Sequence, residues 1–98
     1  MNVFAMRMKS GEEVIFRTEV EFSVLEQSTS KSKLIEIDKP VNMMPVENKV
    51  TFVPWIFFSK SDKFTINTEN VIVFYRAQEQ IESEYRRMTS GIIAPALA

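Results

Sequence analysis

Residues 13–24 read EVIFRTEVEFSV, and their alternation is the clearest secondary-structure signal in the chain. Apolar side chains and Thr18 take every second position from Val14 to Val24, and mostly charged side chains lie between them. This period of two predicts one long β-strand with a buried face and an exposed face. A strand of this length must bend strongly to cover a small core, which predicts a barrel.

The segments on either side extend the pattern into a five-stranded antiparallel meander. Four further strands are predicted, over residues 3–9, 34–44, 50–59 and 71–75. Residues 64–67 continue the fourth strand, and polar loops are predicted at residues 27–33 and 59–63. We expect the third strand to bend or bulge at Pro40. The sequence therefore predicts a mainly β fold, a five-stranded, strongly bent antiparallel barrel over residues 1–76.

The period of the pattern changes after residue 76. Four apolar side chains recur there at helical spacing: Ala77, Ile81, Tyr85 and Met88. Acidic residues come early in this segment and basic residues late, which suits the helix dipole, and Gly91 can end the helix. We therefore expect a C-terminal α-helix over residues 77–91 that packs on the barrel. An apolar tail over residues 92–98 follows, either docked on a neighbour or frayed.

Composition excludes several classes of function. The 98 residues include no cysteine and no histidine, so disulfides, thiolate chemistry and the commonest general base and zinc ligand are missing. There is no Gly-rich phosphate loop, and Glu12-Glu13 fits a solvated hairpin rim better than a catalytic pair. We expect a binding protein, not an enzyme, with no catalytic residue, metal or cofactor. Without a signal peptide or a membrane-length apolar run, we expect a cytoplasmic protein with no membrane contact.

The strands at residues 50–59 and 71–75 are apolar on both faces, which a monomer does not require. Either the C-terminal helix covers their outer face, or another copy of the chain does. The single helical stripe is small for that task, so we expect copies to join edge to edge. The residues expected at this oligomer interface are Val53, Trp55, Phe57, Val71, Ile72 and Phe74.

Two stretches carry a resemblance to a known family: MRMKSGEEVIF at residues 6–16 and FTINTENVIVF at residues 64–74. They are similar to the two sequence segments of the Sm-like (LSm) proteins, and the chain most resembles their phage-type, marine metagenomic variant. IDKPV at residues 37–41 and VPW at residues 53–55 also resemble that variant. The resemblance implies a homo-oligomeric ring of five to seven copies that holds single-stranded RNA in loops around its pore.

The chain departs from the family pattern in three places. Asn67-Thr68 stands where the second segment usually has Arg-Gly, and the loop after the second strand lacks the usual Asp-x-x-x-Asn. A C-terminal helix is predicted in place of the usual N-terminal one. Without this arginine, we do not expect the uridine recognition that is usual in the family.

Charge adds a modest signal for nucleic acid. The net charge is −1, but residues 27–63 hold more lysines than carboxylates. A nucleic-acid site requires cations for phosphates and hydrogen-bonding or planar groups for bases. The expected nucleic-acid-binding residues are Ser30, Lys31, Lys33, Lys60, Lys63 and Asn67. Turn chemistry is the alternative role for Asn67. For Trp55, Phe57 and Phe58 we expect burial in a core or interface in preference to stacking on bases.

The leading hypothesis is a ring-forming Sm-like protein that binds single-stranded nucleic acid, RNA before DNA, in processing or as a chaperone. The alternative is a protein-interaction or scaffolding ring of phage origin that does not bind nucleic acid. A phage-encoded chain would work in the cytoplasm of the host cell.

Overall fold

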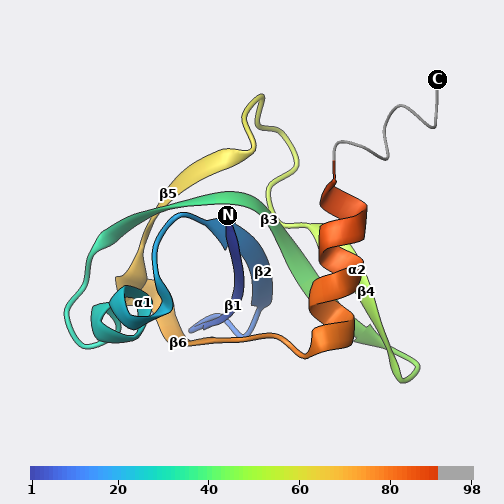
Figure 1. The fold of residues 1–98 in the computed structure, drawn as a ribbon, viewed down its shortest axis with the longest axis horizontal. Helices are drawn as coiled ribbons and strands as arrows, with labels where there is room; N and C mark the ends of the chain where they lie inside the picture. Colours follow the sequence, from blue (N-terminus) through green and yellow to red (C-terminus); the bar gives the residue numbers. More distant parts are fainter. Residues whose placement is uncertain (91–98) are drawn as a thin grey trace.

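The computed structural model describes residues 1–90, so the expected apolar tail lies outside the described residues. Six strands form one antiparallel sheet: β1 (Asn2–Met8), β2 (Glu13–Thr18), β3 (Leu34–Val46), β4 (Lys49–Pro54), β5 (Lys63–Asn67) and β6 (Val71–Tyr75). The other elements are the helices α1 (Phe22–Ser28) and α2 (Glu79–Thr89) and the 3-10 turn η1 (Thr68–Asn70). The prediction of a mainly β fold with a C-terminal helix is confirmed (Figure 1).

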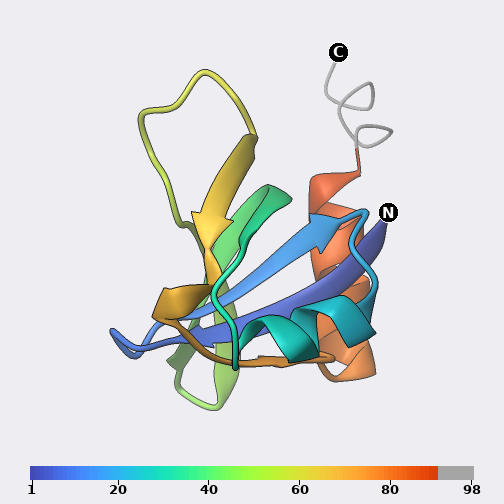
Figure 2. The ribbon, with the colours of Figure 1, turned by 90° about the vertical axis from the view of Figure 1, so that its left-hand side faces the viewer.

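The sheet curves around an interior but stays open (Figures 1 and 2). Its strand order is β4-β3-β2-β1-β6, and β5 pairs with the first half of β3 while β4 pairs with the second half. Among residues 1–90, β6 pairs with β1 alone, so the hydrogen-bonded circuit of a closed barrel is not completed. The fourth strand, expected to reach Ser59, ends at Pro54, because proline has no amide hydrogen to donate. The chain leaves the sheet from there until Lys63.

β3 bends at Lys39 and Pro40, as the sequence predicted for Pro40. The register of β2 against β3 shifts at this point, and Lys39 has a left-handed backbone with φ of 50°. The backbone N–H of Lys39 donates to the carbonyl oxygen of Asp62 at 2.8 Å. The bend therefore divides β3 between two partner strands and ties it to the loop that precedes β5.

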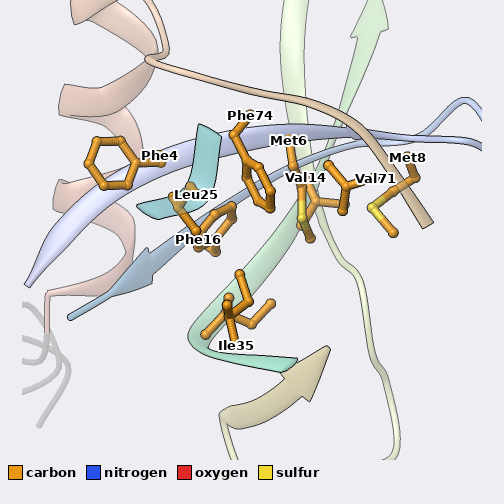
Figure 3. Close-up of a cluster of buried hydrophobic side chains, with 10 residues drawn as sticks. Phe4, Met6, Met8, Val14, Phe16, Leu25, Ile35, Val71 and Phe74 are labelled. Atoms are coloured by element: carbon orange, nitrogen blue, oxygen red, sulfur yellow. The ribbon is translucent and has the colours of Figure 1, made fainter. Parts of the chain in front are cut away.

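An inner core fills the space that the sheet encloses (Figure 3). Its buried members come from β1, β2, α1, β3 and β6: Phe4, Met6, Met8, Val14, Phe16, Leu25, Ile35, Ile37, Val71 and Phe74. The alternating side chains of β1 and β2 point into this core, as the period of two predicts.

The prediction that the second strand continues to Val24 is wrong. β2 ends at Thr18, whose hydroxyl donates to the Glu36 carbonyl at 2.9 Å and accepts from the Val20 N–H at 3.1 Å. These bonds turn the chain out of the sheet, and α1 follows. Phe22 and Leu25 are three residues apart, so they share one face of α1, and Leu25 is fully buried in the inner core.

A second, outer core lies on the opposite face of the sheet. Val3, Ala5 and Ile15 are buried there against Tyr85 of α2, and Ile81 packs beside them. Residues 3–6 are consequently buried on both faces, although they lie one strand from the edge of the sheet. α2 thus covers the outer face of β1 and β2. On β6, Tyr75 packs against this outer core, while Ile72 and Val73 are exposed.

Candidate nucleic-acid interface

Thr68 joins the two loops that carry most of the predicted binding residues. Its hydroxyl donates to the Ser28 carbonyl at 3.0 Å and accepts from the Lys33 N–H at 2.9 Å. Its own N–H donates to the Lys33 carbonyl at 2.9 Å, and the side chain is buried. The loop at residues 29–33 therefore lies directly against the turn at residues 67–70.

The exposed side chains on these two loops carry two ammonium groups, two amides, three hydroxyls and the carboxylate of Glu69. Asn67 caps η1 by accepting the Glu69 N–H at 2.9 Å, so the turn role foreseen for it is present. That bond uses the side-chain oxygen and leaves the NH₂ group for a ligand. The hydroxyl of Ser30 already donates to the Gln27 carbonyl at 3.0 Å. Lys31 and Lys33 are exposed, and neither takes part in the ion pairs formed within residues 1–90.

The other two predicted lysines lie elsewhere. Lys63 begins β5 and Asn67 ends it, which separates them by roughly 13 Å along the strand at 3.3–3.4 Å per residue. Lys60 lies in the loop at residues 55–62, on the far side of Lys63. The structure thus brings Lys31, Lys33 and Asn67 together and places Lys60 and Lys63 in a separate group.

The loop at residues 55–62 exposes its aromatic side chains. Phe57 is 65% exposed and Phe58 100% exposed, so neither enters a core of the single chain. Burial in a core, one of the two expectations for these rings, is therefore wrong for both. Trp55 behaves differently, because it is half-buried and packs against the inner core.

The predicted interface residues divide between core and surface. Val71 and Phe74 are each 4% exposed and belong to the inner core, so they are not accessible to a second copy. A bulge in the pairing of β1 with β6 turns both Ile72 and Val73 outward, at 53% and 44% exposure. The remaining predicted residues lie on β4 or just beyond it: Val53, Trp55 and Phe57.

A groove of about 390 Å³ opens beside Asn67, with Lys9, Asn70 and Trp55 in its lining. The Lys9 N–H donates to the Asn70 carbonyl at 2.9 Å, which holds the hairpin between β1 and β2 against η1. Lys9 is a cation that the sequence did not assign to the interface. Its place beside Asn70 depends on β6 returning to pair with β1, and no local sequence signal reports such a contact.

Residues 1–90 contain no cluster of three or more histidine, cysteine, aspartate or glutamate side chains arranged to hold a metal ion. No helix in that range has the length and apolar character to cross a membrane.

No protein-family model matches the chain, and no curated protein sequence matches it.

Proposed function

We propose that this chain is a ring-forming, Sm-like protein that binds single-stranded nucleic acid, RNA before DNA. The observation that carries the proposal is the attachment of residues 29–33 to residues 67–70 through Thr68. Lys31 and Lys33, which form no ion pair within residues 1–90, and the amide of Asn67 consequently lie on adjoining loops, together with the exposed carboxylate of Glu69. Cations hold phosphates and amides hydrogen-bond base edges, so this surface has both of the groups that a strand requires.

The path of the chain supports the Sm-like part of the proposal. If β4 and β5 are counted as one interrupted strand, five strands follow in meander order and the last returns beside β1. The interruption is the loop at residues 55–62, and η1 leads from β5 into the last strand. This is the strand order expected of a strongly bent five-stranded barrel with one gap.

The two ends of the sheet support assembly into a ring. Within residues 1–90, β6 pairs only with β1, and β4 pairs only with β3, so each strand has an unpaired edge. An exposed apolar edge such as that of β6, with Ile72 and Val73, is a template for another strand. Contact between two different edges is head-to-tail and closes into a ring when the rotation between copies allows. Lys31 and Lys33 would then recur in every copy and form a continuous positive belt.

Binding of labelled RNA and DNA oligonucleotides at two salt concentrations tests the proposal. We expect affinity to fall as salt rises, because each neutralised phosphate releases counterions. Replacing two lysines together, Lys31→Ala with Lys33→Ala, should weaken binding at low salt by roughly tenfold or more and flatten the salt dependence.

Lys49→Ala is the matched control. Lys49 is an exposed lysine at the start of β4, and it pairs with Val46 at the opposite end of β3 from Leu34. We expect its replacement to leave binding unchanged. If the unmodified protein binds neither RNA nor DNA at low salt, the proposal is wrong and a protein-scaffolding ring becomes the better assignment.

A further inference from the structure

The surface around Thr68 lacks one component of a single-strand site. Residues 28–33 and 67–70 contain no aromatic side chain. Proteins that bind single strands combine cations for the backbone with rings on which the bases stack. If the chain binds nucleic acid as proposed above, rings from another part of the fold must serve the bases. Phe57 and Phe58 are the exposed aromatic residues of the described chain.

These two rings lie on a loop that stands away from the sheet (Figure 2). The ring centroids of Phe57 and Phe58 are 6.2 Å apart, and the ring planes are inclined by 46°. At this inclination the rings are not stacked on each other, so each has a face for a flat partner. With exposures of 65% and 100%, neither ring must leave a packed position before it binds.

The loop is fixed at its base by several contacts. Asp62 accepts the backbone N–H of Lys39 at 2.8 Å, and its carboxylate pairs with the Lys39 ammonium at 3.1 Å. The Ser59 hydroxyl donates to the Ser61 carbonyl at 2.8 Å and accepts the Ser61 N–H at 3.0 Å. The Lys63 N–H donates to the Ser61 hydroxyl at 3.0 Å. These contacts fix residues 59–63, the part of the loop that leads from the two rings into β5.

The charge of the loop suits phosphates. Its carboxylate, on Asp62, pairs with Lys39, and neither Lys60 nor Lys63 takes part in the ion pairs formed within residues 1–90. Two rings and two cations therefore occur within seven consecutive positions, residues 57–63. In a nucleic-acid strand each base lies one sugar away from its phosphate, so a binding loop requires rings and cations in the same short segment.

β5 connects the loop to the surface around Thr68. Lys63, Thr65 and Asn67 are exposed along this strand, while Phe64 and Ile66 turn inward. The exposed face of β5 therefore presents an ammonium group, a hydroxyl and an amide in sequence. Its length, roughly 13 Å at 3.3–3.4 Å per residue, is within the reach of a few nucleotides.

We propose that Phe57 and Phe58 form a stacking platform for the bases of a single strand. Lys60 and Lys63 bind the neighbouring phosphates, and the strand continues along β5 to Asn67. This inference rests on the proposed function, because it assigns the base contacts of the same interface. The other occupants that exposed rings can take, a second copy of the chain or a membrane, become outcomes of the test.

Strands with and without bases test the platform. We would compare an oligouridine with an abasic ribose-phosphate strand of equal length at one salt concentration. The unmodified protein should prefer the strand with bases by about tenfold or more, because stacking contributes about 1–3 kcal/mol per base. Replacing both rings, Phe57→Ala with Phe58→Ala, should abolish that preference. The double variant should still bind the abasic strand with unchanged salt dependence, because the lysines remain.

A second pair of substitutions, Phe57→Leu with Phe58→Leu, removes the rings but keeps the apolar surface. We expect it to lose the preference for bases as the alanine variant does. If the unmodified protein binds neither strand, the proposed function fails and the platform fails with it. If it binds both strands equally, or if the alanine variant keeps the preference, only the platform is overturned.

If stacking on bases is overturned, two further measurements identify what the rings of Phe57 and Phe58 contact. Native mass measurement reports assembly, and co-sedimentation with phosphatidylcholine–phosphatidylserine vesicles reports membrane binding. Assembly or vesicle binding that the leucine variant keeps and the alanine variant loses would show that a second copy or a membrane covers the rings, against the platform. The result expected from the proposal is that all three proteins assemble alike and none sediments with vesicles.

Discussion

Tyr85 fastens α2 to the bend in β3. Its ring is fully buried in the outer core, and its hydroxyl donates to the Lys39 carbonyl at 2.6 Å. Tyr85→Phe would leave that carbonyl without this donor. We expect the free energy of unfolding, measured with urea at neutral pH, to fall by about 1–3 kcal/mol, the usual cost of a buried group that loses its partner.

The same residue predicts how stability responds to alkali. Burial raises the pKa of Tyr85 above the ordinary tyrosine value of about 10. The folded protein therefore holds this proton more tightly than the unfolded chain, so the stabilisation is complete below about pH 10 and is lost as pH rises through the folded-state pKa. The cost of Tyr85→Phe should shrink above about pH 10. An equal cost at neutral and alkaline pH would contradict this.

Tyr75→Phe provides the comparison for that experiment. Burial raises the pKa of Tyr75 first, and its hydrogen bond to the Glu13 carboxylate, at 2.5 Å, raises it further. The Tyr75 hydroxyl donates to Glu13, whereas the Tyr85 hydroxyl donates to Lys39. Tyr75→Phe should therefore leave the bond between α2 and Lys39 intact, while it also reduces the loss of stability in alkali.

Among the elements, the hairpin between β3 and β4 has an unfavourable sequence for its geometry. Glu47 and Asn48 form a two-residue turn between paired Val46 and Lys49, with φ of 49° and 66°. Two left-handed residues define a type I′ turn, which favours Asn-Gly. Replacing Glu47→Asn with Asn48→Gly should raise the free energy of unfolding by about 1 kcal/mol, because a left-handed backbone costs most L-residues about 1–2 kcal/mol.

Glu47→Gln is the control for that turn, since it removes the charge and keeps a side chain of the same shape. Its effect on the free energy of unfolding should stay within about 0.5 kcal/mol. Equal stabilisation by both variants would mean that charge, not backbone conformation, limits the turn.

The sequence predicts an element well when local residues determine where it ends, and poorly when contacts with distant residues determine its end. Alternation located β1 and β3, because it records burial on one face of a strand, whereas β6 was predicted from a short run that is apolar on both faces. It failed after Thr18, where Phe22 and Val24 continue the alternation but bonds from Thr18 to Glu36 and Val20 turn the chain into α1. The apolar residues beyond Pro54 wrongly suggested a strand that reaches Ser59, but β4 ends at Pro54.

The candidate site was predictable to a similar degree. Exposed lysines and Asn67 were identifiable from their polar loops. Their grouping was not, because it depends on Thr68 bonding to Lys33, and on Asn70 bonding to Lys9 at the other end of the chain. Phe58 was misjudged for a different reason: aromatic residues are usually buried, and only the observed loop reveals its full exposure.

For the whole molecule, assembly is the property that one substitution tests most directly. Ile72 is 53% exposed on the unpaired edge of β6, next to the buried Val71. Ile72→Lys places a charge where a second copy would pair, and charged side chains block edge pairing. We expect the native mass to fall to that of a smaller species, while the free energy of unfolding changes by less than about 0.5 kcal/mol.

Leu34→Lys serves as the control for assembly. Leu34 is 71% exposed and pairs with Asn67 inside the sheet, away from the edge of β6. Its replacement should leave the mass unchanged. A single-subunit mass for the unmodified protein, or an unchanged mass for Ile72→Lys, would rule out assembly through this edge.

Lys39 has a wider consequence than its own contacts. The backbone N–H of Lys39 donates to the carbonyl of Asp62, and the backbone carbonyl of Lys39 accepts the hydroxyl of Tyr85. Lys39 therefore links the loop at residues 55–62 to the position of α2. The base of the loop at residues 55–62 and the packing of α2 thus depend on the backbone conformation of a single residue.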